Sequence, residues 1–156
     1  AAMMPMQFFC PRQSDTERLA QTLASACPIG MVVYLQGGLG AGKSTFARAF
    51  IHTLGFHGSI KSPTYSLLEA YRLDAGGEAI HMDLYRLADP EEVDYLALDD
   101  YEKNAMVTFI EWPEKGEGHI PSADLCIDFR MQPEGRLLKF KPCTPQAMNW
   151  ISSINT

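Results

Sequence analysis

The strongest constraint on the fold is an octapeptide, GGLGAGKS at residues 37–44, which fits the pattern G-x-x-x-x-G-K-[ST] in full. The residues before it, MVVYLQ at 31–36, are apolar and partly β-branched, as in a buried parallel strand. After it, Phe46, Phe50 and Leu54 recur every four positions and share one face of a helix. A strand, a glycine loop and a helix in this order predict a phosphate-binding loop.

Each part of this loop has a chemical task in nucleotide binding. Glycines let successive backbone N–H groups turn toward phosphate oxygens, helped by the positive end of the following helix. Lys43 is expected to reach the β- and γ-phosphates, and the Ser44 hydroxyl to bind a Mg²⁺ ion that bridges them. Thr45 is a candidate for a contact with the α-phosphate. The predicted nucleotide-binding residues are Gly38, Leu39, Gly40, Ala41, Gly42, Lys43, Ser44 and Thr45.

Two further apolar segments run into an acid, as a Walker B strand does. Residues 79–83 end at Asp83, and residues 107–111 end at Glu111. P-loop enzymes use such carboxylates to hold Mg²⁺ or to orient the attacking water. We assign Asp83 to the outer shell of the metal and Glu111 to the catalytic water or the metal, and the pattern leaves an exchange of these roles open. Together with Ser44, these two acids are the predicted metal ligands.

The segment KSPTY at residues 61–65 follows the phosphate-loop helix. Many P-loop proteins carry a switch there that senses the γ-phosphate, and Thr64 is then the natural sensor. The alternative is an ordinary loop in which the serine before the proline is merely extended. A D-x-x-G match at residues 74–77 is better explained as a hairpin turn, and the absence of an N-K-x-D sequence argues against a GTPase.

The rest of the chain alternates between strand and helix patterns. We expect strands at residues 7–10, 66–73, 78–85, 106–110, 125–129 and 138–140. We expect helices at residues 14–26, capped by Ser14 with Glu17, at 89–101, capped by Asp89, and from Thr144 to the C-terminus. The turn sequences DAGG and QPEG predict two hairpins. The fold class is therefore α/β, a P-loop NTPase-like mixed sheet with helices on both faces and two β-hairpins, in one domain over residues 1–156.

The composition of the chain indicates which kinds of partner and which cellular compartment to expect. Nineteen acidic against 13 basic residues give a net charge of −6, which argues against direct gripping of a nucleic-acid backbone. The four cysteines show no metal-type or redox spacing and are expected to be free thiols. No apolar run approaches the ~20 residues that span a bilayer, and residues 1–11 lack the basic start and apolar stretch of a signal peptide. These features predict a cytoplasmic protein that contacts no membrane.

An acidic run extends from Asp89 to Glu102. It contains seven acids and no base. The simplest interpretation is the solvated face of a helix, and the alternative is an acidic docking surface.

Four motifs in consistent order resemble the TsaE family: GGLGAGKST at 37–45, KSPTY at 61–65, HMDLYRL at 81–87 followed by DPEE, and IEWPEKG at 110–116. TsaE proteins are bacterial P-loop ATPases needed for threonylcarbamoyladenosine formation in tRNA. The resemblance covers nearly the whole chain. It implies a small ATPase that uses ATP and Mg²⁺, acts with the TsaD and TsaB proteins, and meets tRNA only indirectly through that complex.

Carried over by position, the resemblance places Lys43 and Ser44 in the Walker A loop, and Thr64, Asp83 and Glu111 in the other motifs. The implied catalytic residues are Lys43, Glu111, Asp83 and Thr64, the same residues that the chemistry selects. This chain departs from the usual family pattern at Gly38, often an acid, and at Ser44, often threonine. Serine keeps the hydroxyl that Mg²⁺ needs.

Two other functions share these motifs. A small-molecule kinase would need an acceptor pocket and an arginine-rich lid, and the region after Glu111 is poor in arginine. A nucleotide-gated interaction module would bind ATP without essential hydrolysis. Arg86 is a candidate for stabilising transferred charge, although an arginine after a strand is more often part of a surface ion pair. Without an assured arginine finger, we expect slow hydrolysis that a partner stimulates.

Overall fold

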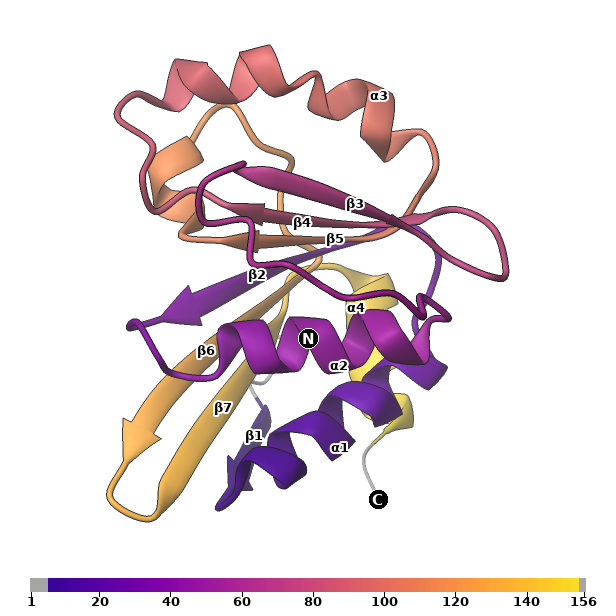
Figure 1. The fold of residues 1–156 in the computed structure, drawn as a ribbon. Coiled ribbons are helices and arrows are strands. Elements are labelled where there is room, and N and C mark those ends of the chain that lie inside the picture. The colour runs from indigo at the N-terminus through magenta and orange to yellow at the C-terminus, as the bar shows by residue number, and fades with distance from the viewer. Residues whose placement is uncertain (1–5, 155–156) are drawn as a thin grey trace.

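The computed structural model describes residues 6–154, which form one seven-stranded mixed sheet covered on both faces (Figure 1). Residues 1–5, the first part of the segment considered for a signal peptide, lie outside the described residues. The strands are β1 (Met6–Cys10), β2 (Met31–Gly37), β3 (Leu68–Arg72), β4 (Glu78–Asp83), β5 (Ala105–Glu111), β6 (Leu125–Gln132) and β7 (Gly135–Pro142).

The strands lie in the order β1-β7-β6-β2-β5-β4-β3. The central strands β6, β2, β5 and β4 are parallel, so their carboxyl ends share one edge. β3 pairs with β4, and β7 with β6, in antiparallel hairpins, and β1 adds antiparallel to β7. The predicted mixed sheet and both predicted hairpins are confirmed.

Helices pack on one face of the sheet and shorter segments on the other. The first face carries α1 (Gln13–Ser25), α2 (Lys43–Thr53) and α4 (Pro145–Ser153), and the second carries η1 (Pro90–Leu96), α3 (Leu98–Glu102) and η2 (Pro113–Gly116). The strands divide their side chains accordingly, because neighbours in a strand point to opposite faces. Ala79 and Phe109 join the core under α2, whereas Ile80 and Ile110 join the core under η1 and α3.

Two local expectations were wrong. The first helix begins at Gln13 rather than after a Ser14 cap, because the Asp15 carboxylate accepts a hydrogen bond from the Arg12 backbone N–H at 2.9 Å. The expected helix at 89–101 begins at the predicted Asp89 cap, which accepts from the Glu91 N–H at 2.9 Å, but it is broken at Ala97.

The break at Ala97 has a packing cause. Ala97 has a φ of +53° and separates a 3₁₀ segment from a short α-helix. Val93 and Leu98 are both buried in the second core. In one continuous α-helix these two residues, five positions apart, would point about 140° away from each other. The break lets both face the sheet. Within residues 6–154, the helices are too short or too polar to cross a membrane.

Candidate functional site

The phosphate loop leaves β2 at its carboxyl end and turns at three glycines. Gly37, Gly40 and Gly42 have φ values of +142°, +76° and +105°, which residues with a side chain rarely adopt. A Cβ at Gly37 would lie 2.5 Å from the carbonyl oxygen of Phe129 on β6, so only glycine allows this close approach. Gly38 has no atom within 4 Å of its Cβ position, so a side chain would meet no obstacle there.

Lys43 begins α2 and lies inside the site rather than in solvent, with 5% of its side chain exposed. Its Nζ donates a hydrogen bond to the Gly37 carbonyl oxygen at 2.7 Å. The same atom lies 4.0 Å from Oε1 of Glu111 and 4.3 Å from the centre of the Trp112 ring. Burial lowers the pKa of Lys43, and the Glu111 carboxylate opposes this by favouring the charged form. The ammonium can exchange its bond to Gly37 for an anion in the loop.

Asp83 and Glu111 end β4 and β5 and are direct neighbours in the parallel pairing of these strands. They are only 9% and 4% exposed. Oδ1 of Asp83 accepts a hydrogen bond from the Tyr85 N–H at 3.0 Å. Burial raises the pKa of Asp83; the hydrogen bond from Tyr85 opposes this effect, and the nearby Glu111 charge adds to it. Two acids and Lys43 thus share one site in which all three side chains are largely buried.

His81 holds the Glu111 carboxylate in place. It lies two residues before Asp83 on the same face of β4, is 2% exposed, and places Nε2 at 2.6 Å from Oε2 of Glu111. Within residues 6–154, Nδ1 of His81 is buried and has no hydrogen-bond partner. A carboxylate oxygen can only accept a hydrogen bond, so Nε2–H of His81 donates this bond to Glu111. This bond leaves the second carboxylate oxygen directed toward Lys43.

The segment that carries Thr64 is tied to the end of β4. Leu67 N–H donates to the Pro63 carbonyl at 2.9 Å, and Asp83 N–H donates to the Leu67 carbonyl at 3.0 Å. The hydroxyl oxygens of Ser62 and Thr64 lie 2.6 Å apart. Both hydroxyls therefore reach the site beside the two acids.

A cavity of about 230 Å³ opens between these elements. It brings together all four residues predicted to be catalytic. Two of the predicted nucleotide-binding residues, Gly38 and Ala41, do not line it, and Ala41 is buried in the core with 1% exposed. The lining residues are Leu39, Gly40, Gly42, Lys43, Ser44, Thr45, Ser62, Thr64, Asp83, Glu111, Trp112 and Arg136.

The donor set fits a hard divalent cation. Ser44, Asp83 and Glu111 offer one hydroxyl and two carboxylates, the oxygen ligands that Mg²⁺ prefers. Within residues 6–154, no three His, Cys, Asp or Glu side chains are grouped to hold a metal by themselves. A cation at this site would therefore need additional oxygen ligands, such as those of a bound phosphate.

Three residues of the site were not predicted. His81 follows from strand alternation, because it lies on the same face as Asp83. Trp112 is adjacent to Glu111 in the sequence, has a φ of +56°, and packs against Tyr85 with the ring centres 5.0 Å apart and the ring planes tilted by 50°. Arg136 comes from β7, and no local pattern reveals it. Arg86, which was considered for charge stabilisation, instead lies 4.7 Å above the exposed Tyr65 ring.

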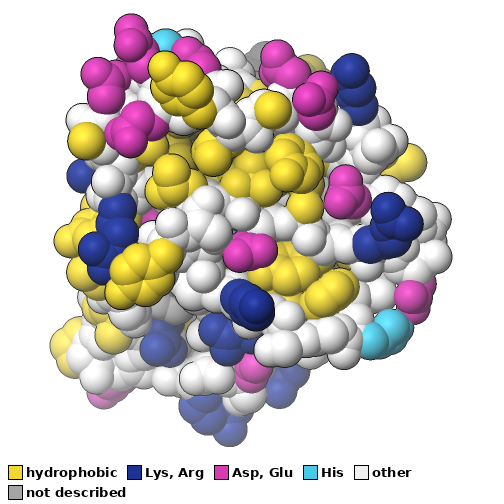
Figure 2. All heavy atoms as spheres, turned by 45° about the horizontal axis from the view of Figure 1, so that its top comes forward, with side chains coloured by type: hydrophobic (Ala, Val, Ile, Leu, Met, Phe, Trp, Pro, Cys, Tyr) yellow, Lys and Arg dark blue, Asp and Glu magenta, His cyan; other side chains and the backbone are white. Residues whose placement is uncertain are grey.

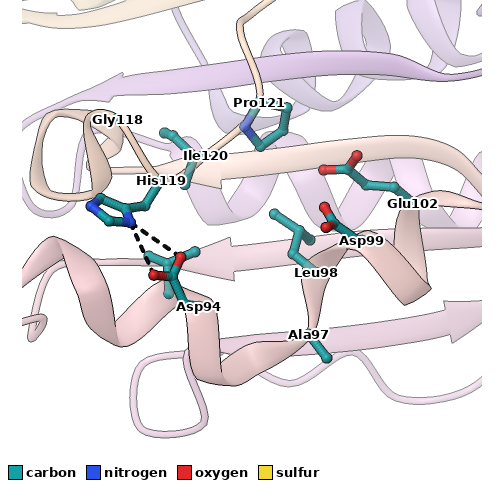
Figure 3. A pocket seen from close by; sticks show the side chains of 10 residues that line it. Asp94, Ala97, Leu98, Asp99, Glu102, Gly118, His119, Ile120 and Pro121 are labelled. Carbon is teal, nitrogen blue, oxygen red and sulfur yellow. Dashed lines mark hydrogen bonds and ion pairs between the residues drawn. The ribbon is translucent and has the colours of Figure 1, made fainter.

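A second hollow lies on the other side of the sheet, between the η1–α3 segment and residues 118–121 (Figure 3). It is larger, about 600 Å³, and Asp94, Asp99 and Glu102 line it. Asp94 pairs with Nδ1 of His119 at 3.1 Å at one end, and Asp99 and Glu102 lie near each other at the other end (Figure 3). Burial and the Asp99 charge raise the pKa of Glu102. These carboxylates would repel a phosphate.

The surface shows the same division of charge. In Figure 2, acidic side chains gather along the upper edge, over the η1–α3 segment, around a hydrophobic patch. Most Lys and Arg side chains on this face lie in its lower half.

Comparison with known proteins places the chain in a family. Residues 10–138 match the family described as "Threonylcarbamoyl adenosine biosynthesis protein TsaE". The chain belongs to the TsaE family. The Haemophilus influenzae tRNA threonylcarbamoyladenosine biosynthesis protein TsaE is 41% identical over 125 residues, which cover 80% of this chain and 78% of that protein. The Bacillus subtilis TsaE is 35% identical over 113 residues, covering 72% and 70%.

A solved structure extends the comparison to the fold. The crystal structure of Bacillus subtilis YdiB superposes with a TM-score of 0.79 at 25% identity, covering 99% of this chain and 96% of that one. The matched TsaE region contains the phosphate loop, Asp83, Glu111 and Arg136, so all residues that line the candidate site lie within it. The resemblance to TsaE seen in the sequence is confirmed.

Proposed function

We propose that this chain is the ATP-binding and ATP-hydrolysing component of tRNA threonylcarbamoyladenosine biosynthesis, acting in the cytoplasm with the TsaD and TsaB proteins. The observation that carries the proposal is the convergence of Lys43, Asp83 and Glu111, all buried, at the carboxyl edge of the sheet beside the phosphate loop. Membership of the TsaE family supports the pathway. The net charge of −6 supports an indirect relation to tRNA, through the partner complex.

The geometry suggests a role for each residue. Lys43 turns from the Gly37 carbonyl to the β- and γ-phosphates, where its charge offsets the charge that develops during transfer. Ser44 and Asp83 would hold the Mg²⁺ that accompanies ATP, and this ion would neutralise phosphate charge. Glu111, oriented by His81, positions the attacking water. Thr64, tied to β4 through Leu67, senses the γ-phosphate.

The proposal includes stimulation by the partner. Arg86 lies over Tyr65 and does not line the cavity. Stabilisation of transition-state charge by a partner's arginine raises the rates of P-loop enzymes by ~10³-fold or more. We therefore expect slow hydrolysis by the isolated chain and faster hydrolysis in the complex.

Phosphate release from ATP tests the proposal. The rate is measured for the chain alone and with matched TsaB and TsaD, with Lys43→Ala as the inactive control. A stimulated rate that Lys43→Ala abolishes is the expected result. Absence of ATP binding by the intact chain would contradict the proposal, and transfer of phosphate to an organic acceptor would favour a kinase.

A further inference from the structure

Arg136 reaches the phosphate loop from the far end of the chain. It lies at the start of β7, paired with Cys10 on β1 and Met131 on β6. A Cβ built at Gly42 would lie 3.1 Å from both Cδ and Nε of Arg136, so the arginine stem crosses directly over the loop backbone. The side chain lines the same cavity as Lys43. A second cation therefore lies against the N-terminus of α2.

Arg136 is partly buried, and within residues 6–154 its buried Nε atom lacks a hydrogen-bond partner. In the same range of residues, Arg136 takes part in no ion pair. The other arginine of this hairpin, Arg130, pairs with Asp128 at 2.9 Å. A buried N–H without an acceptor is costly, and the positive end of a helix dipole disfavours a further cation. An anion bound at the loop would compensate both effects.

Arg136 and the carboxylates lie on opposite flanks of the loop. β2 has β5 on one side and β6 on the other, with β7 beyond β6. Glu111 ends β5 and Asp83 ends β4, so both acids lie on the first flank. Arg136 approaches from the second flank, away from the residues proposed for Mg²⁺ and water. Its planar fork suits two oxygens of one phosphate.

We propose that Arg136 is a phosphate-binding residue of this site, which holds the nucleotide from the β7 flank and sets its affinity rather than its rate of hydrolysis. The inference rests on the proposed nucleotide binding. A contact that is equally strong in the ground state and the transition state lowers KM without changing kcat. The role of Arg136 thus differs from that of Glu111, which acts on the rate.

Calorimetric titration with ADP and with inorganic pyrophosphate, both with Mg²⁺, tests this role. Arg136→Gln should weaken the binding of both ligands by about tenfold to a hundredfold, which is the effect of one charge-assisted hydrogen-bonded contact. The affinity of Arg136→Lys should lie between those of wild type and Arg136→Gln, because lysine keeps the charge but lacks the planar guanidinium group. Arg130→Gln, a change on the same hairpin, should bind as wild type does. The KM of Arg136→Gln for ATP should rise by a similar factor.

Several results would overturn the inference. One is an affinity for ADP that is the same for Arg136→Gln and wild type. Another is a lower affinity for ADP with an unchanged affinity for pyrophosphate, which would indicate that Arg136 contacts the base or ribose. A lower thermal midpoint with unchanged affinities would show a structural role. Failure of the wild-type chain to bind either ligand would overturn the proposed function and this inference with it.

Discussion

Two hollows of this molecule, the cavity at the phosphate loop and the groove at η1–α3, differ in size, burial and the balance of charge. The cavity at the phosphate loop is about 230 Å³ and the groove at η1–α3 about 600 Å³. In the smaller cavity, Lys43, Asp83 and Glu111 are 5%, 9% and 4% exposed. In the larger groove, the side chain of Asp94 is 61% exposed. Water solvates the charged side chains in the groove and weakens the interactions between them. In the cavity, opposite charges are buried close together, so they interact strongly. Burial of opposed charges therefore identifies the chemical site better than volume does.

The largest expected effect comes from Glu111→Gln. The amide keeps the shape of the side chain and removes the charge that positions water, so hydrolysis should fall by about 10²–10⁴-fold while ATP affinity is retained. Single-turnover hydrolysis and titration with ATP measure the two quantities. Glu117→Gln, which changes an exposed acid just after η2, is the matched control and should behave as wild type. A Glu111→Gln protein that supports tRNA modification fully would favour the nucleotide-gated module.

His81→Phe is expected to cause a smaller loss of hydrolytic activity than Glu111→Gln. The substitution removes the 2.6 Å hydrogen bond that orients Glu111, and loss of such a supporting bond costs about 10–100-fold in activity. His81→Gln can still donate and should restore part of the rate. A rate of hydrolysis by His81→Phe equal to that of wild type would show that His81 only fills space.

Local sequence patterns predict the part of the site that local structure builds. The glycine loop, its strand and its helix follow from residues 31–54, and the acids at the ends of two apolar runs meet because parallel strands end at one edge. Arg136 could not be found in this way, since its place depends on β7 returning beside β6. The break at Ala97 depends equally on tertiary contacts, because Val93 and Leu98 must face one core. Long-range packing, rather than local propensity, determined these positions.

Asp83 should give the cavity a pH dependence of intermediate size. Its raised pKa means that protonation, which prevents metal binding, begins at a higher pH than for an ordinary aspartate. The Mg²⁺-dependent affinity for ADP should therefore begin to fall at a higher pH than it would with an ordinary aspartate, and Asp83→Asn should bind weakly at every pH tested.

Asp83→Asn should stabilise the fold at neutral pH although it weakens the binding of Mg²⁺–ADP. A carboxyl whose pKa is higher in the folded than in the unfolded chain destabilises the fold as pH rises through its titration. Asp83→Asn should therefore raise the thermal midpoint at neutral pH while it weakens Mg²⁺–ADP. A lower midpoint would show that the hydrogen bond from Tyr85 N–H outweighs the cost of burying the charge.

The smallest effect is expected in the acidic groove. Burial and Asp99 raise the pKa of Glu102, so its ionised form is slightly unfavourable in the folded chain at neutral pH. Glu102→Gln should change the free energy of unfolding by no more than about 0.5 kcal/mol, toward stability, and leave ATP affinity unchanged. Asp100→Asn is the matched control. The Asp100 carboxylate lies 3.8 Å from Nζ of Lys103, so removing its charge should not stabilise the fold.

Weaker ATP binding by Glu102→Gln would show that the groove and the cavity are coupled across the sheet. Reduced stimulation by the partners at an unchanged basal rate would instead favour the acidic run as a docking surface.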